Sequence, residues 1–109
     1  MKTTSRQQRR SHNKGCEKPL RTIRRHWGTL QQRYKVKQIG VFGSVARGER
    51  RNDSDIDVLV EYEELPDLLE FINLENYLQE ILKQKVDLVE KHGVRPELKH
   101  RIFEEVVYL

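Results

Sequence analysis

Two aspartates at the start of an apolar segment carry the clearest chemical signal in this sequence. Asp55 and Asp57 stand two residues apart, and Ile56 and residues 58–60 around them are apolar. Residues two apart on a β-strand point to the same side, so both carboxylates would share one face. Their charges repel unless a cation compensates, and magnesium prefers carboxylate oxygens while keeping positions open for phosphate oxygens. The pair therefore predicts a divalent-metal site.

A phosphate-binding turn is predicted just upstream, where Gly43 and Ser44 follow an apolar segment. Glycine lets the backbone approach a ligand closely. A helical turn that starts there presents free N–H groups and the positive end of its dipole to a phosphate. The Ser44 hydroxyl would donate a further hydrogen bond to a triphosphate bound at this turn. The planar guanidinium of Arg47, one helical turn further on, would reach the same triphosphate.

A third carboxylate stands in a later apolar segment, where Asp87 lies between Val86 and Leu88. A charged residue inside a short apolar strand needs a partner. If this strand lies beside the strand of Asp55 and Asp57, Asp87 completes a cluster of three carboxylates. The alternative is an ordinary aspartate on an edge strand.

These residues require a sheet that brings them to one edge. β-branched and aromatic residues between turn residues predict strands, which are expected at 35–42, 56–62 and 86–89. Apolar residues recurring at spacings of three and four predict helices, which are expected at 19–34, 67–83 and 97–108, with a short helical turn at 44–48. This order predicts an α/β or α+β fold with a small, mixed, three- to four-stranded sheet and helices packed on it.

Charge divides the chain into a basic arm and an acidic body. Twelve Lys and Arg residues and one acidic residue precede residue 38, whereas nine basic and sixteen acidic residues follow. Residues 1–18 lack an apolar period and are expected to be a disordered arm, and residues 19–109 to be the domain. The arm could contact nucleic acid or an acidic partner, or it could be a solvated extension.

Composition also limits where the protein acts. No apolar run is long enough to span a bilayer, and the basic N-terminus lacks the apolar segment of a secretory signal. Cys16 is the single cysteine, which fits a reduced thiol. We expect a cytoplasmic protein.

The pattern Gly-Ser-x-Ala-Arg-Gly, with Asp-x-Asp ten residues after Gly-Ser, resembles the minimal nucleotidyltransferases of the DNA polymerase β-like superfamily. The resemblance runs from about residue 20 to residue 108 and implies the polymerase β-like nucleotidyltransferase fold. It also implies two Mg²⁺ ions and a catalytic, metal-binding set consisting of Asp55, Asp57 and Asp87. The residues implied to bind the nucleotide are Gly43, Ser44 and Arg47.

Many members of this group resemble the antitoxins of HEPN–MNT toxin–antitoxin pairs. This implies transfer of AMP from ATP onto a hydroxyl, a tyrosine, of a HEPN ribonuclease toxin, which is thereby silenced. Only about 20 residues follow Asp87, so we expect much of the acceptor site to come from a partner protein. Two alternatives stay open: a non-catalytic module that neutralises its partner by occlusion, and a nucleic-acid binder that acts through residues 1–18.

Overall fold

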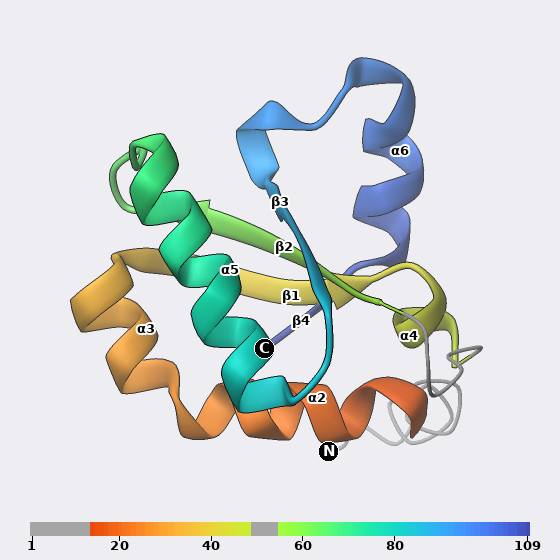
Figure 1. The fold of residues 1–109 in the computed structure, drawn as a ribbon. Helices are drawn as coiled ribbons and strands as arrows, with labels where there is room; N and C mark the ends of the chain where they lie inside the picture. The colour runs from red at the N-terminus through yellow and green to blue at the C-terminus, as the bar shows by residue number, and fades with distance from the viewer. Residues whose placement is uncertain (1–13, 49–54) are drawn as a thin grey trace, which may run out of the picture.

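A four-stranded sheet forms the centre of the protein in a computed structural model that describes residues 14–48 and 55–109 (Figure 1). The strands lie in the order β3-β2-β1-β4. Their bounds are Val36–Phe42 for β1, Ile56–Tyr62 for β2, Val86–Glu90 for β3 and Val107–Tyr108 for β4. Because β2 runs antiparallel to β1 and parallel to β3, the predicted mixed sheet is confirmed.

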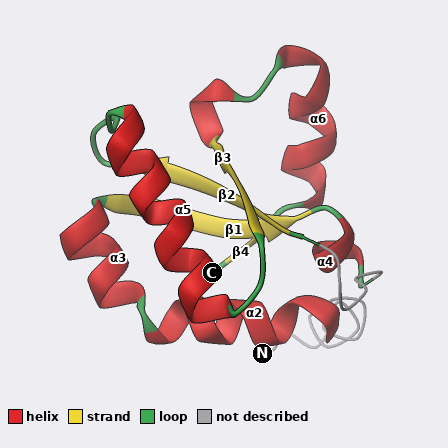
Figure 2. Cartoon of the chain, viewed as in Figure 1, coloured by secondary structure: helices red, strands yellow, loops and turns green. Residues whose placement is uncertain are grey.

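Helices pack against both faces of this sheet (Figure 2). Their bounds are Lys14–Arg25 for α2, Trp27–Tyr34 for α3, Ser44–Arg47 for α4, Leu68–Leu82 for α5 and Pro96–Glu105 for α6, with the 3-10 turn η1 at Lys91–Gly93. No helix in the described part of the chain is long and apolar enough to cross a membrane.

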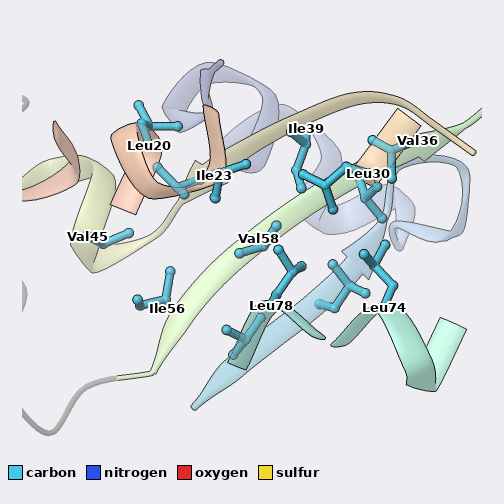
Figure 3. Packing of buried hydrophobic residues seen from close by; sticks show 14 of the residues in the cluster. Leu20, Ile23, Leu30, Val36, Ile39, Val45, Ile56, Val58, Leu74 and Leu78 are labelled. Atoms are coloured by element: carbon cyan, nitrogen blue, oxygen red, sulfur yellow. The ribbon is translucent and has the colours of Figure 1, made fainter. Parts of the chain in front are cut away.

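Strand β2 is buried on both sides, as its unbroken apolar run predicts. Val58 and Val60 face the larger core beneath α2, α3 and α5, where Ile23, Leu74 and Leu78 also lie (Figure 3). Leu59 faces the opposite side and packs with residues of α6 and the segment before it. The carboxylate-bearing strand is therefore held rigidly in the middle of the fold.

Helix α5 begins where the sequence predicts. The Asp67 side chain accepts a hydrogen bond from the Glu70 backbone N–H at 2.8 Å, and the Glu70 side chain accepts one from the Asp67 N–H at 3.0 Å. This reciprocal capping box satisfies two N–H groups that the first turn would otherwise leave unpaired.

The N-terminal helical region differs from the prediction in two ways. Helix α2 begins at Lys14 and contains Pro19 in its interior, so residues 14–18 belong to this helix and not to the predicted disordered arm. Proline in a helix interior costs about 3 kcal/mol. Pro19 is buried, and its packing against the rest of the protein offsets part of this cost. The rest of the predicted arm, residues 1–13, lies outside the described residues.

The predicted single helix is also broken at His26. Its ring Nδ1 lies 2.9 Å from the Thr22 carbonyl oxygen, which the His26 backbone N–H would use in a continuous helix. That N–H instead bonds the Ile23 carbonyl oxygen at 3.0 Å. Helix α3 consequently starts afresh at Trp27.

The prediction of a helix to residue 108 is wrong at its end. Helix α6 ends at Glu105, and β4 pairs with β1 through Gly40 and Tyr108. A Cβ on Gly40 would lie 2.7 Å from the Val107 carbonyl oxygen, so the missing side chain makes room for this strand.

Candidate active site

Asp57 and Asp87 stand side by side on neighbouring parallel strands. They are direct register partners at the beginnings of β2 and β3, and neighbouring strands lie about 4.8 Å apart. The prediction that the strand of Asp87 lies next to that of Asp57 is confirmed. Asp57 is half-buried and Asp87 is exposed. The two carboxylates therefore form a row that becomes more accessible to solvent from Asp57 to Asp87.

Asp55 completes the acidic surroundings from the residue before β2. It is exposed, and its charge is one of those that act on Asp57. Within residues 14–48 and 55–109, no three acidic, histidine or cysteine side chains converge into a ready-formed metal site. The carboxylates therefore form an open row.

The Asp57 carboxyl group is electrostatically unusual. Burial, followed by the charges of Asp87 and Asp55, raises the pKa of Asp57 from 3.8 to about 6. Arg47 lowers this pKa, and Glu105 adds a smaller rise. The raised pKa means that the negative charge of Asp57 is unfavourable, so a bound cation would stabilise the ionised carboxylates. Carboxylate oxygens are ligands that suit magnesium.

The glycine turn approaches this carboxylate closely. Gly43 has φ +73° and ψ −148° and stands immediately before α4. A Cβ at this position would overlap Oδ2 of Asp57 and lie 3.1 Å from its Cγ. Ser44 is the first residue of α4, and no side chain caps the beginning of that helix. Close backbone approach therefore occurs at the point where the sequence predicts a phosphate-binding turn.

Arg47 is held at the same edge by a residue that the sequence analysis missed. Its Nη1 lies 3.0 Å from Oε2 of Glu105, at the end of α6. The same carboxylate oxygen lies 3.4 Å from Nε of Arg101. Glu105 is 58 residues from Arg47 in the chain, and nothing in the local sequence around either residue signals the contact.

Of the six predicted site residues, Gly43, Arg47, Asp57 and Asp87 gather at this edge of the sheet. Asp55 contributes through its charge and Ser44 through its place in α4. The arrangement combines an acidic row, a close-approaching backbone turn and a guanidinium. It is suited to a cation bound together with a polyphosphate.

Comparisons with known proteins point in the same direction. The profile of the nucleotidyltransferase domain family matches residues 23–109. A curated relative from Thermococcus cleftensis, the protein adenylyltransferase MntA, is 48% identical over 84 residues, which are 77% of this chain and 85% of the relative.

Two solved structures share the fold. One, described as a candidate minimal nucleotidyltransferase, superposes with a TM-score of 0.71 at 39% identity, covering 84% of this chain and 94% of the other. The other is a complex of tri-AMPylated HEPN toxin with MNT antitoxin from Shewanella oneidensis. It superposes with a TM-score of 0.53 at 22% identity, over 92% of this chain and 70% of the other, and shows likeness of fold alone.

Proposed function

This chain belongs to the nucleotidyltransferase domain family, and we propose that it is a cytoplasmic protein adenylyltransferase that moves AMP from ATP onto a hydroxyl group of a partner protein. The observation that carries the proposal is the pairing of Asp57 with Asp87 beside the Gly43 turn. The name of the relative that is 48% identical supports adenylyl transfer to a protein.

Asp55, Asp57 and Asp87 are the residues that hold two Mg²⁺ ions in this proposal. The donor set fits, because Asp57 shares its site with two further acidic groups that raise its pKa. Bound there, the ions would neutralise phosphate charge and stabilise the attacking and leaving oxygens of an in-line displacement.

The chain's own residues have separate tasks in the transfer. Gly43 and Ser44 bind the β- and γ-phosphates through the turn, and Arg47 contributes its guanidinium. The acceptor hydroxyl oxygen attacks the α-phosphorus, a new P–O bond forms, and the bond to pyrophosphate breaks. The hydroxyl proton passes to a carboxylate oxygen of Asp87, which is more exposed than Asp57 and so is the one that an incoming protein reaches.

We further propose that the acceptor is a tyrosine of a HEPN-domain toxin. The AMPylated HEPN toxin in the Shewanella oneidensis complex supports this choice, although that likeness concerns the fold alone. Transfer of AMP adds charge and bulk to the toxin, which silences it.

The test is transfer of label from ATP radiolabelled at the α-phosphate, with magnesium, to a purified HEPN-domain protein. With a HEPN-domain protein from the same organism as the partner, we expect label on that protein, and loss of the label in Asp57→Asn. The matched control is Glu97→Gln in α6, which should transfer normally. If Asp55→Ala/Asp57→Ala neutralises the toxin fully and no label is transferred by the wild type, the protein acts by occlusion instead.

A further inference from the structure

Apolar side chains are exposed on the outer side of α5 and the turn before it. Leu65, Leu68 and Leu69 are 75%, 74% and 67% exposed, and Ile72 one turn further is also exposed. Leu74 and Leu78 on the inner side of the same helix are fully buried, so the core does not need the outer residues. Exposed apolar side chains gathered along one short segment in this way are typical of an interaction surface.

The charged residues next to this patch in sequence are all acidic. Residues 63–82 contain six acidic residues and no basic residue. Glu63, Glu64, Asp67 and Glu70 are exposed and lie next to the apolar residues in sequence. An apolar patch with an acidic border favours a partner that brings apolar and positively charged side chains together.

A hollow of about 640 Å³ adjoins the patch between α3 and α5. It is lined by residues that include Tyr34, Tyr62, Leu65, Asn73 and Tyr77, and its charged lining residues are Arg33, Lys35, Glu64, Glu70 and Glu80, so that acidic residues outnumber basic ones. The rings of Tyr34 and Tyr77 lie 5.1 Å apart. Because the Arg33 guanidinium already lies over the Tyr34 ring at 5.7 Å, Tyr77 is the ring that could receive an arginine or lysine of a partner. The amide of Asn73 offers both donors and an acceptor.

Tyr62 places a buried hydroxyl among the residues that line the hollow. It is 93% buried, since its relative exposure is 7%, and its hydroxyl has no hydrogen-bond partner among the described residues. Buried hydroxyl groups in native proteins are nearly always satisfied. A polar group that enters the hollow would supply the absent partner.

This region is distant from the proposed chemistry. Tyr62 ends β2, whereas Asp57 is near its beginning, and five residues of strand span roughly 16 Å. Contacts made here are therefore separate from contacts with the triphosphate.

We propose that the α5 face, defined as Leu65, Leu68, Leu69 and Ile72 with the adjoining hollow, docks the acceptor protein through a segment that carries apolar side chains and Lys or Arg. The inference rests on the proposed function, because it takes the docked protein to be the one that receives AMP. Docking at this face holds the acceptor while its hydroxyl reaches the carboxylate row.

A docking face of this kind has a distinct kinetic signature. Its contacts are the same before and during transfer, so their loss raises the KM for the acceptor and leaves kcat and the binding of nucleotide unchanged. A defect of the carboxylate row lowers kcat instead.

The first test is Leu68→Ser/Leu69→Ser, with Leu98→Ser/Phe103→Ser in α6 as the matched control, since Leu98 and Phe103 are also exposed. Calorimetric titration with the HEPN-domain acceptor should show binding at least 10-fold weaker for the α5 variant. Binding of a non-hydrolysable ATP analogue should be unchanged for both variants, and the control should bind the acceptor normally.

The second test addresses charge. Glu63→Lys/Glu64→Lys should weaken acceptor binding several-fold and flatten its dependence on salt concentration, because screening acts on the charges that it reverses. The control, Glu97→Lys/Glu104→Lys, places the same change on α6.

Tyr62→Phe provides a readout that a merely structural residue would not give. In the free protein this change removes an unsatisfied buried hydroxyl, so the midpoint of urea unfolding should stay the same or rise. Acceptor binding should nevertheless weaken several-fold. Unchanged acceptor binding would remove the hydroxyl from the docking contact.

The outcomes separate this inference from the proposed function. If the wild type transfers label and Leu68→Ser/Leu69→Ser binds acceptor equally well, the docking face is wrong while the transferase activity stands. If the wild type neither binds nor labels the acceptor, both proposals fail. If sedimentation shows a dimer that the same variant converts to a monomer, the face joins two copies of this chain, and the docking proposal is overturned.

Discussion

The backbone of Gly43 packs so closely against the carboxylate of Asp57 that no side chain fits between them. A Cβ on Gly43 would overlap Oδ2 of Asp57, and the residue's φ of +73° is strained for any residue with a side chain. The glycine turn and the carboxylate row therefore form one unit. A change in either residue should affect both phosphate and metal binding.

Gly43→Ala should consequently lower AMP transfer by 10-fold or more and reduce the free energy of unfolding by about 1–3 kcal/mol, from backbone strain and displacement of Asp57. Labelled transfer and urea unfolding measure the two effects. Gly28→Ala is the matched control, since a Cβ on Gly28 meets nothing within 4 Å. Because alanine favours a helix over glycine, Gly28→Ala should preserve activity and unfold no more easily than the wild type. Normal activity in Gly43→Ala would refute the close-approach argument.

The raised pKa of Asp57 predicts an inverse dependence of stability on pH in the metal-free protein. Its pKa is about 6 in the fold and 3.8 as the ordinary value, so the folded state binds more protons between these limits. The contribution of the Asp57 carboxyl group to the free energy of unfolding is therefore fully present below about pH 4, and it is lost as the pH rises through about 6. Urea unfolding in EDTA measures it.

Asp57→Asn should remove this contribution, because its amide does not titrate, and Glu97→Gln should keep the wild-type trend. If the metal-free wild type and Asp57→Asn show the same pH trend between 4 and 6, the burial and charge repulsion inferred at Asp57 do not act on it. Addition of magnesium should stabilise the wild type most above pH 6, where the carboxylate is ionised.

The contact between Glu105 and Arg47 predicts a change in nucleotide affinity. If Arg47 binds phosphate as proposed, Glu105 would compete with the phosphate oxygens for its guanidinium, since Oε2 of Glu105 lies 3.0 Å from Nη1 of Arg47. Glu105→Gln keeps the shape of the side chain and removes the negative charge that attracts the Arg47 guanidinium. We expect an ATP analogue to bind up to about 5-fold more tightly, in line with the ~1 kcal/mol of a partly exposed ion pair.

Glu104→Gln is the control for that experiment, because Glu104 contacts His100 on the outside of α6 at 3.2 Å. Its affinity for the analogue should equal that of the wild type in the same fluorescence titration. Weaker binding by Glu105→Gln would mean that Glu105 orients Arg47 toward the phosphates and does not compete with them.

The site and the fold differ in how far the sequence could predict them. The row of Asp57 and Asp87 was predictable because strong local signals placed each residue in an apolar strand. The contact of Glu105 with Arg47 was not, because it joins side chains 58 residues apart and depends on where α6 packs. Strand β4 was likewise not predictable from the sequence, because a strand of two residues shows no alternation of apolar and polar side chains. Its pairing with β1 depends on the absence of a side chain at Gly40.

The capping box of α5 yields a prediction about stability that also bears on the docking face. Asp67→Ala removes the acceptor for the Glu70 N–H, a bond of 2.8 Å, and should cost about 1 kcal/mol of unfolding free energy. Glu70→Gln is the matched control, because the glutamine carbonyl can still accept the bond from the Asp67 N–H and should cost much less. Urea unfolding of both variants compares them directly.

Leu68 and Leu69 lie in the turn that this cap holds. Loss of the cap should therefore also weaken acceptor binding modestly while leaving binding of the ATP analogue unchanged, since the proposed phosphate site lies at the other end of the sheet. An Asp67→Ala protein with wild-type stability would show that α5 is held by the packing of Leu74 and Leu78 alone, with no contribution from its capping box.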